Sequence, residues 1–223
     1  MSEDIVEANI SPGTEALFQG AEVFEIEIGG KSPKWYLEEL EKNGIHVQTD
    51  AAKMIQSPEF NPDPEPKKLK LVKLRVADLV GIDLDARDEK FWQYRKDGKE
   101  GLLNKLISDS NVSTRQIFEA AQMFGLEVCP PEVGPALAID RINKPIEERN
   151  LIVAMNPIII KVHDVNWPMV FAASHNKEDH PSIGSKKGFG LGCTTAFFDP
   201  RYLDDKWQPE TQMVFRLGNL PVQ

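Results

Sequence analysis

Residues 113–139, STRQIFEAAQMFGLEVCPPEVGPALAI, carry the local signals that decide the fold. Ser113 or Thr114 is suited to cap a helix, because a short side-chain oxygen satisfies amide donors that the first turn leaves unpaired. Ile117 and the apolar residues after it recur at helical spacing on one face. Gly125 marks the end of the helix, since glycine adopts the left-handed conformation at little energetic cost. The first half of the stretch therefore predicts a capped helix.

The second half of the stretch alternates short apolar runs with proline and glycine. Residues 126–129 predict a short strand, and the two prolines that follow must end it or place it on a sheet edge, because proline donates no backbone hydrogen bond. Gly134 and Pro135 make a second break, after which we expect another extended segment over 136–139. The whole stretch predicts a helix–strand–turn–strand unit.

The run GLEVCPPEVGP at residues 125–135 resembles a motif of a family of small uncharacterised bacterial proteins, often associated with phages or mobile elements. In that family a similar helix precedes Gly-Leu-Glu-Leu-Cys-Pro-x-Glu-Val-Gly-Pro. The likeness extends upstream to the helix start near Lys31 and the IQSPEF segment that ends at Phe60, and downstream to Trp207–Leu217. The resemblance implies a shared fold and supplies no activity.

Length and composition indicate a globular chain of ordinary make-up. The 223 residues are 41% hydrophobic and 27% charged, enough for one sizeable core. We expect a flexible acidic tail over 1–20 and a single α+β domain over 21–223. No run approaches the roughly 18 apolar residues that a membrane helix needs. The start of the chain lacks a signal-peptide pattern and the two cysteines form no disulfide framework, so we expect a cytoplasmic location.

Apolar periodicity changes along the chain in a way that predicts an α+β fold. We expect helices mainly in the N-terminal half, packed against a mostly antiparallel meander in the C-terminal half. Cations alternate with apolar residues in KKLKLVKLRV, residues 67–76, and predict the solvent-facing side of a strand. One or two helices should fill 88–108. Their expected packing residues are Phe91, Trp92, Leu102, Leu103 and Leu106.

Charge is spread unevenly and bears on the choice of partner. Residues 1–66 contain 14 acidic and 4 basic side chains, whereas residues 67–110 contain 11 basic and 8 acidic ones. The acidic first third argues against nucleic acid, because phosphate contacts need clustered Lys and Arg. We therefore expect a protein or small-ligand partner, with the oligomeric state open.

Candidate metal ligands and nucleophiles gather after residue 160. His163, His175 and His180, with acidic neighbours, are candidate ligands for a divalent metal, although their spacing fits no established metal motif. His175, His180 and Cys193 are candidate catalytic residues, since a thiol beside an imidazole can act as a nucleophile. A buried thiol in an apolar strand is the simpler interpretation of Cys193. We predict no cofactor.

The run SIGSKKGFGLGC invites a phosphate-binding interpretation. Lys186, Lys187, Gly188 and Gly190 are the candidate cofactor-binding residues, because backbone amides in glycine-rich loops can hold anions. The run matches neither the P-loop nor the dinucleotide fingerprint, and glycines in a strand commonly allow close packing. The surrounding loop, residues 174–190, is the segment in which we expect functional variation.

Two classes of function follow from these patterns. The sequence favours a non-enzymatic binding or regulatory module that acts through protein or small-ligand contacts. The alternative is a small metal-dependent or cysteine hydrolase built around His163, His175, His180 and Cys193. Glu132 can be interpreted as a catalytic acid or as a turn carboxylate that accepts backbone amides. The binding module is favoured, because the catalytic residue types are sparse and unpaired.

Overall fold

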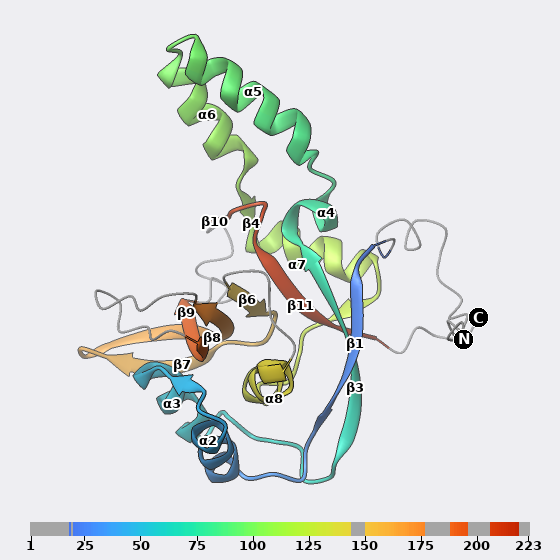
Figure 1. Cartoon of the computed structure of the whole chain (residues 1–223), viewed down its shortest axis with the longest axis vertical. Coiled ribbons are helices and arrows are strands. Elements are labelled where there is room, and N and C mark those ends of the chain that lie inside the picture. The colour runs from blue at the N-terminus through green and yellow to red at the C-terminus, as the bar shows by residue number, and fades with distance from the viewer. Residues whose placement is uncertain (1–17, 19, 144–149, 177–187, 196–205, 219–223) are drawn as a thin grey trace.

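The described residues fold around a nine-stranded mixed sheet that curls about one buried helix, α8 (Figure 1). This computed structural model describes residues 18, 20–143, 150–176, 188–195 and 206–218. The strands of the large sheet are β1 (Glu22–Ile28), β2 (His46–Val47), β3 (Lys67–Arg75), β5 (Leu126–Glu127), β6 (Asn150–Val153), β7 (Ile158–Val162), β8 (Val165–Asn176), β9 (Gly188–Thr195) and β11 (Gln212–Leu217). A separate two-stranded sheet joins β4 (Val112–Ser113) to β10 (Lys206–Trp207).

Helices lie on both sides of the sheet and at one end of it. They are α2 (Pro33–Lys42), α3 (Thr49–Gln56), α4 (Val76–Val80), α5 (Leu84–Lys96), α6 (Glu100–Ser110), α7 (Thr114–Met123) and α8 (Val133–Asp140), followed by the short 3-10 helix η1 (Arg141–Asn143). α2 packs on α3 and α8, whereas α4 and α7 pack on each other beside β3 and β5. None of the described helices combines the length and apolarity needed to cross a membrane.

The predicted α+β class is confirmed, with a strand order that a meander does not have. The order is β1-β3-β11-β6-β8-β9-β2, with β5 beside β11 and β7 beside β8. Most pairs are antiparallel, but β11 with β6 and β2 with β9 are parallel. Strands from the first third of the chain share the sheet with the C-terminal strands, because β11 pairs with β3 on its other side. The expected tail over 1–20 lies almost entirely outside the described residues.

The predicted second strand of the opening stretch is wrong, because residues 133–140 form helix α8. The six residues from Val133 to Ala138 are all buried, so the helix shows no polar face and no helical periodicity. Pro135 is tolerated because it lies in the first turn, where its missing N–H would have no intrahelical acceptor. Helix α8 contacts β1 on one side and β8 and β9 on the other. It therefore lies at the centre of the core.

Close packing at α8 also explains a glycine in the opening stretch. A Cβ atom on Gly134 would lie 2.4 Å from ring atoms of Phe171 in β8. Real Cβ contacts are not found at this distance, so the aromatic ring occupies the space that any larger residue would need. The preceding helix is confirmed as α7: the Ser113 hydroxyl accepts from the Gln116 N–H and the Gln116 side chain accepts from the Ser113 N–H, forming a capping box.

The basic run at residues 67–76 is half of a charged ladder between β1 and β3. Lys68 and Lys70 lie opposite Glu27 and Glu25, and Lys73 forms an ion pair with Glu22 at 2.9 Å. Opposite charges at directly facing strand positions stabilise the pairing of strands. The intervening apolar residues of β3 are buried. The prediction of a strand with a solvent-facing basic side is confirmed, and its cations face an acidic strand.

Candidate interaction surface

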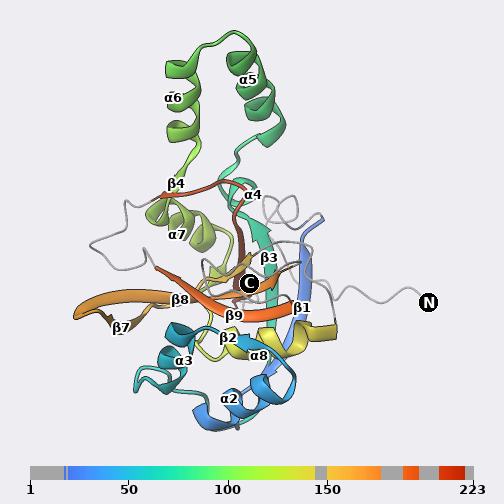
Figure 2. The ribbon, with the colours of Figure 1, turned by 60° about the vertical axis from the view of Figure 1, so that its left-hand side comes forward.

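Helices α5 and α6 form a hairpin that projects from the sheet (Figures 1 and 2). The helices contain 13 and 11 residues, and Gly98 with φ of 66° lies in the turn between them. At 1.5 Å per residue the longer helix extends about 20 Å. Within the described part of the chain, the two helices pack mainly on each other. The expectation of one or two helices over 88–108 is confirmed.

The apolar residues of the hairpin are far more exposed than their sequence suggests. No residue of α5 or α6 is buried. The side chains of Trp92, Leu102 and Ile107 are 61%, 47% and 47% exposed. Trp92 and Leu102, two of the expected packing residues, are therefore largely exposed, because a two-helix layer covers only the inner face of each helix. The other predicted packing residues, Phe91, Leu103 and Leu106, are half-buried.

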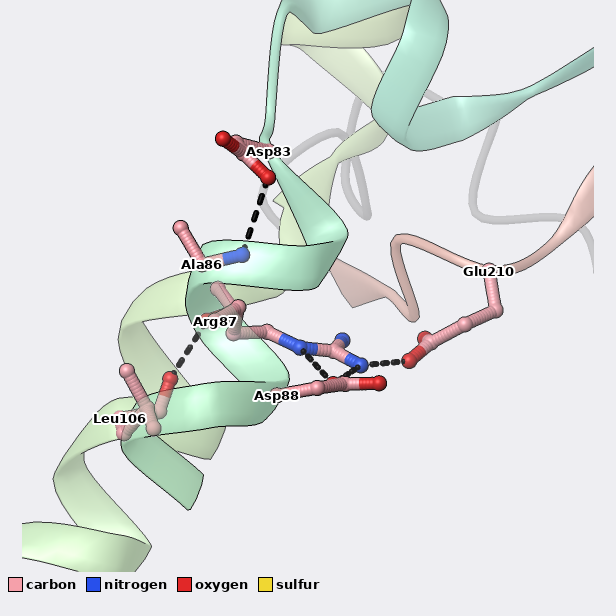
Figure 3. Close-up of polar contacts among 7 residues, drawn as sticks. Asp83, Ala86, Arg87, Asp88, Leu106 and Glu210 are labelled. Atoms are coloured by element: carbon pink, nitrogen blue, oxygen red, sulfur yellow. Dashed lines mark hydrogen bonds and ion pairs between the residues drawn. The ribbon is translucent and has the colours of Figure 1, made fainter. Parts of the chain in front are cut away.

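Polar contacts fix the direction of the hairpin where the chain enters it, at the start of α5 (Figure 3). The carboxylate of Asp83 caps α5 by accepting from the Ala86 N–H at 3.0 Å. Arg87 donates to Asp88 and to Glu210, which lies in the turn before β11. The hydrogen bond to Glu210 raises the pKa of Arg87 above its usual range. Exposed ion pairs contribute about 1 kcal/mol or less, so this contact orients the hairpin more than it stabilises the fold.

The end of the hairpin where the chain leaves α6 is fixed by a buried hydrogen bond and a short strand pair. The last turn of α6 is closed by a bond from the Ser110 hydroxyl to the Leu106 carbonyl oxygen at 2.7 Å. Strand β4 follows at once and pairs with β10. The indole N–H of Trp207 in β10 donates to the Thr114 hydroxyl at 2.8 Å, and both residues are buried. Both ends of the hairpin that join the sheet are therefore held by specific contacts.

The structure does not bring the described candidate histidines together. His163 is exposed in the turn between β7 and β8, with φ of 47°. His175 is the second-to-last residue of β8, so its backbone lies at the other end of this 12-residue strand from the turn that holds His163. Among the residues that the structure describes, no group of three or more His, Cys, Asp or Glu side chains could hold a metal. His180 lies outside the described residues.

Neither cysteine has the environment of a nucleophile. Burial, and then the nearby charge of Asp50, raises the pKa of Cys193 to about 11, so the thiol is protonated at neutral pH. Cys193 lies opposite Phe171 in the β8–β9 ladder, and His175 lies four residues further along β8, a step of about 13 Å. Cys129 is buried, and burial raises its pKa as well. Both thiols behave as small apolar groups.

The candidate glycine Gly190 lies where β2 approaches β9 closely, since a Cβ atom there would lie 3.3 Å from the His46 carbonyl oxygen. Gly190 forms a parallel pair with His46 of β2. A Cβ atom on Gly192 would lie 2.8 Å from the Gln48 side-chain oxygen. Gly188 begins the strand opposite Asn176. The candidate residues Lys186 and Lys187, with most of the loop 174–190, lie outside the described residues.

Glu132 is a buried carboxylate that ties distant segments together. One of its oxygens accepts from the Gly29 N–H at 2.9 Å and the Tyr36 hydroxyl at 3.3 Å, and the other accepts from the Asp63 N–H at 3.1 Å. Glu132 itself is 2% exposed. Burial and then the charge of Glu132 raise the pKa of Tyr36 above its usual range. The interpretation of Glu132 as a carboxylate that accepts backbone amides is confirmed.

The hollows of the described surface hold few groups that could do chemistry. One of about 520 Å³ lies between the end of α2 and β2 and is lined by Leu37, Glu41, Gly44, Ile45, His46 and Val47. A smaller one, of about 240 Å³, lies between β1, α2 and α8 and includes Lys31, Trp35 and Asp140. Lys31 is held 5.0 Å from the centre of the Trp35 ring. Neither hollow pairs a nucleophile with a base.

Sequence reasoning missed the exposed face of the hairpin, although one signal could have revealed it. Helix α5, LDARDEKFWQYRK, has no apolar stripe of the kind that a core-facing helix shows. Comparison with protein-family models, curated proteins and solved structures found no match to this chain. The likeness of residues 125–135 to phage-associated bacterial proteins therefore stays a prediction.

Proposed function

We propose that this chain is a non-enzymatic binding or regulatory module whose contact element is the α5–α6 hairpin. The observation that carries the proposal is the projection of two helices with no buried residue from a well-packed sheet. Helices of this length are marginal on their own in water and gain most of their stability by packing an apolar face. A partner that covers the hairpin would supply that missing packing.

The exposed side chains are of the kind that dominate protein interfaces. Tryptophan and arginine are enriched among the residues that carry most of the binding energy. Trp92 is 61% exposed, and the Arg95 guanidinium lies 5.4 Å from the centre of its ring. Because both ends of the hairpin that join the sheet are held by specific contacts, little conformational freedom is lost when this surface binds. We therefore propose a protein partner and a cytoplasmic location, and the acidic net charge argues against nucleic acid.

The hydrolase alternative has less support. It needs a thiolate at Cys193, whereas the raised pKa keeps that thiol protonated at neutral pH. It also needs histidines that meet at one point, and the described positions of His163 and His175 lie at opposite ends of β8.

Site-specific photo-crosslinking tests the binding proposal, because it captures a partner whose identity is not known beforehand. The photoreactive residue p-benzoylphenylalanine replaces Trp92 in one variant and Lys34 in a control variant. Lys34 lies on α2, at the other end of the molecule, and its side chain is 84% exposed. We expect irradiated cells to yield a covalent protein adduct from position 92 and none from position 34. Equal yields at the two positions, or no adduct at 92, would refute the proposal.

A further inference from the structure

The hairpin carries opposite charges at its two ends. The half nearest the sheet, residues 83–89 and 106–110, contains one base, Arg87, and five acids: Asp83, Asp85, Asp88, Glu89 and Asp109. The half with the turn, residues 90–105, contains two acids and five bases: Lys90, Arg95, Lys96, Lys99 and Lys105. We call these halves the acidic base and the basic tip. The hairpin is therefore a charge dipole about 20 Å long.

Much of this charge is not compensated within the hairpin itself. Arg87 is engaged by Asp88 and Glu210, and Lys99 is paired with Asp97 at 2.8 Å. Among the described residues, by contrast, the cations Lys90, Lys96 and Lys105 form no ion pair. The same is true, within those ranges, of the carboxylates Asp85, Glu89 and Asp109. Asp85 acts electrostatically on Arg75 outside the hairpin, so the basic tip offers three charges to a partner and the acidic base offers Glu89 and Asp109.

We propose that the partner of the hairpin is a second copy of this chain, bound antiparallel so that the basic tip of each copy faces the acidic base of the other. This inference rests on the hairpin being the binding element. A two-fold axis across the hairpins makes both tip–base contacts identical, as in most homodimers. Two antiparallel helix pairs then form a four-helix bundle, the arrangement in which short amphipathic helices commonly bury their remaining faces.

The positions of the exposed apolar residues fit this arrangement. Trp92 lies two residues from the middle of α5, and Leu102 and Ile107 lie three and two residues from the middle of α6. All three are therefore within about 5 Å of the midpoint of the hairpin along its axis. A two-fold axis through that midpoint brings Trp92 and Leu102 of both copies to the centre and leaves the complementary charges at the two ends, whereas Ile107, five residues after Leu102, points to a different side of α6. This is the apolar centre and polar rim of a stable interface.

Antiparallel binding also keeps apart the acidic bodies of the two copies, that is, each chain outside its hairpin of residues 83–110. Residues 83–110 contain 7 acids and 6 bases, so almost all of the net charge of −9 lies on the rest of the chain. Antiparallel hairpins place the two bodies at opposite ends of a bundle about 20 Å long, and charges are screened within about 8 Å at physiological salt. A parallel pair would bring the bodies, and like-charged ends, side by side.

Charge-swapped variants test the proposal by sedimentation equilibrium of the full chain. The tip variant is K90E/K96E/K105E and the base variant is D85K/E89K/D109K. The control K34E/K42E/K53E, on α2 and α3, changes the net charge by the same amount and in the same direction as the tip variant. We expect wild type and the α2–α3 control to sediment at twice 25.1 kDa. Each hairpin variant alone should show a dissociation constant raised about 100-fold or more, because like charges then face each other. An equal mixture of tip and base variants should regain the dimer, which also shows that both are folded.

The apolar centre is tested separately with Trp92→Ala. This change should weaken the dimer about 10-fold or more while leaving the thermal unfolding of the body unchanged, because truncating a central tryptophan removes a main anchor of an interface. High salt, about 0.5 M, should weaken the wild-type dimer as well. A wild type that stays monomeric at about 100 μM, well above micromolar dissociation constants, overturns the proposal. So does a mixture of tip and base variants that fails to associate.

The outcome also separates this inference from the proposed function. If wild type is monomeric but position 92 crosslinks to a different protein, the hairpin binds another partner, such as an acidic protein, and only the self-association is refuted. If position 92 yields no adduct of any kind, both proposals are refuted. A crosslinked product of twice the chain mass supports both.

Discussion

Replacing Glu132 by alanine should be among the most destabilising single changes outside the apolar core. Its carboxylate accepts three hydrogen bonds, from the N–H groups of Gly29 and Asp63 and from the Tyr36 hydroxyl. Removing the acceptor leaves three donors in or near the core without their partner. Each hydrogen bond to a charged group is worth about 1.5–3 kcal/mol, and an unsatisfied buried group costs about 1–3 kcal/mol.

The net effect is smaller than the sum, because the wild-type protein already bears the cost of burying a charge. We expect Glu132→Ala to lower the free energy of unfolding by about 3–5 kcal/mol, a large part of the roughly 5–15 kcal/mol of a typical domain. In a chain of 223 residues this lowers the melting temperature by about 10 °C. Urea unfolding followed by far-ultraviolet circular dichroism measures the change, provided that the slope of the transition is unaltered.

Two further variants test whether the hydrogen bonds of Glu132 stabilise the fold. Glu132→Gln keeps one oxygen and should cost less than alanine, although its amide N–H₂ then faces another donor. Tyr36→Phe removes one of the three donors and leaves the two backbone bonds, so we expect a loss of about 1 kcal/mol. A Glu132→Ala protein within about 1 kcal/mol of wild type would show that these bonds do not hold the segments together.

Three other changes have outcomes that the structure fixes. Gly134→Ala should cost about 3 kcal/mol or more in urea unfolding, since its Cβ would lie 2.4 Å from the Phe171 ring; wild-type stability would show that the ring has room to move. Trp207→Phe removes the indole donor to Thr114 and should cost about 1–2 kcal/mol, with faster hydrogen exchange in α6; unchanged exchange there would show that this bond does not anchor the hairpin. Cys193 has a folded pKa of about 11 against an ordinary value of 9.0, so its contribution to stability is complete below pH 9 and is lost as pH rises towards 11. Alkylation of Cys193 by iodoacetamide should be slow at pH 8 and accelerate over that interval, and rapid reaction at pH 8 would contradict the burial.

Local signals in the sequence were sufficient where short-range chemistry decides the structure. Ser113 caps α7 and Ser32 caps α2, each through a hydrogen bond to an amide of the first turn. The alternation of lysines and apolar residues in 67–75 correctly predicted strand β3. These elements depend on neighbours within a few residues, which the sequence displays directly.

The sequence failed where burial or distant partners decide the structure. Helix α8 is buried along nearly its whole length, so its apolar run has no period that distinguishes it from a strand. Trp92 is a residue type common in cores, and only the three-dimensional arrangement shows that 61% of it stays exposed. The sequence indicated that Glu132 accepts backbone amides, but its partners Gly29 and Asp63 lie 103 and 69 positions away, so no local pattern could identify them.

The position of β11 has a consequence for how the protein is made. This strand pairs with β3 on one side and β6 on the other, so Gln212 lies between Arg75 and Leu151. During synthesis on the ribosome, both of those earlier strands leave the exit tunnel with an open edge that only the late segment 212–217 can fill. Open strand edges pair readily with other chains, so this interval is one in which a nascent chain is exposed to misassembly. We therefore expect the sheet to close only after β11 has been translated.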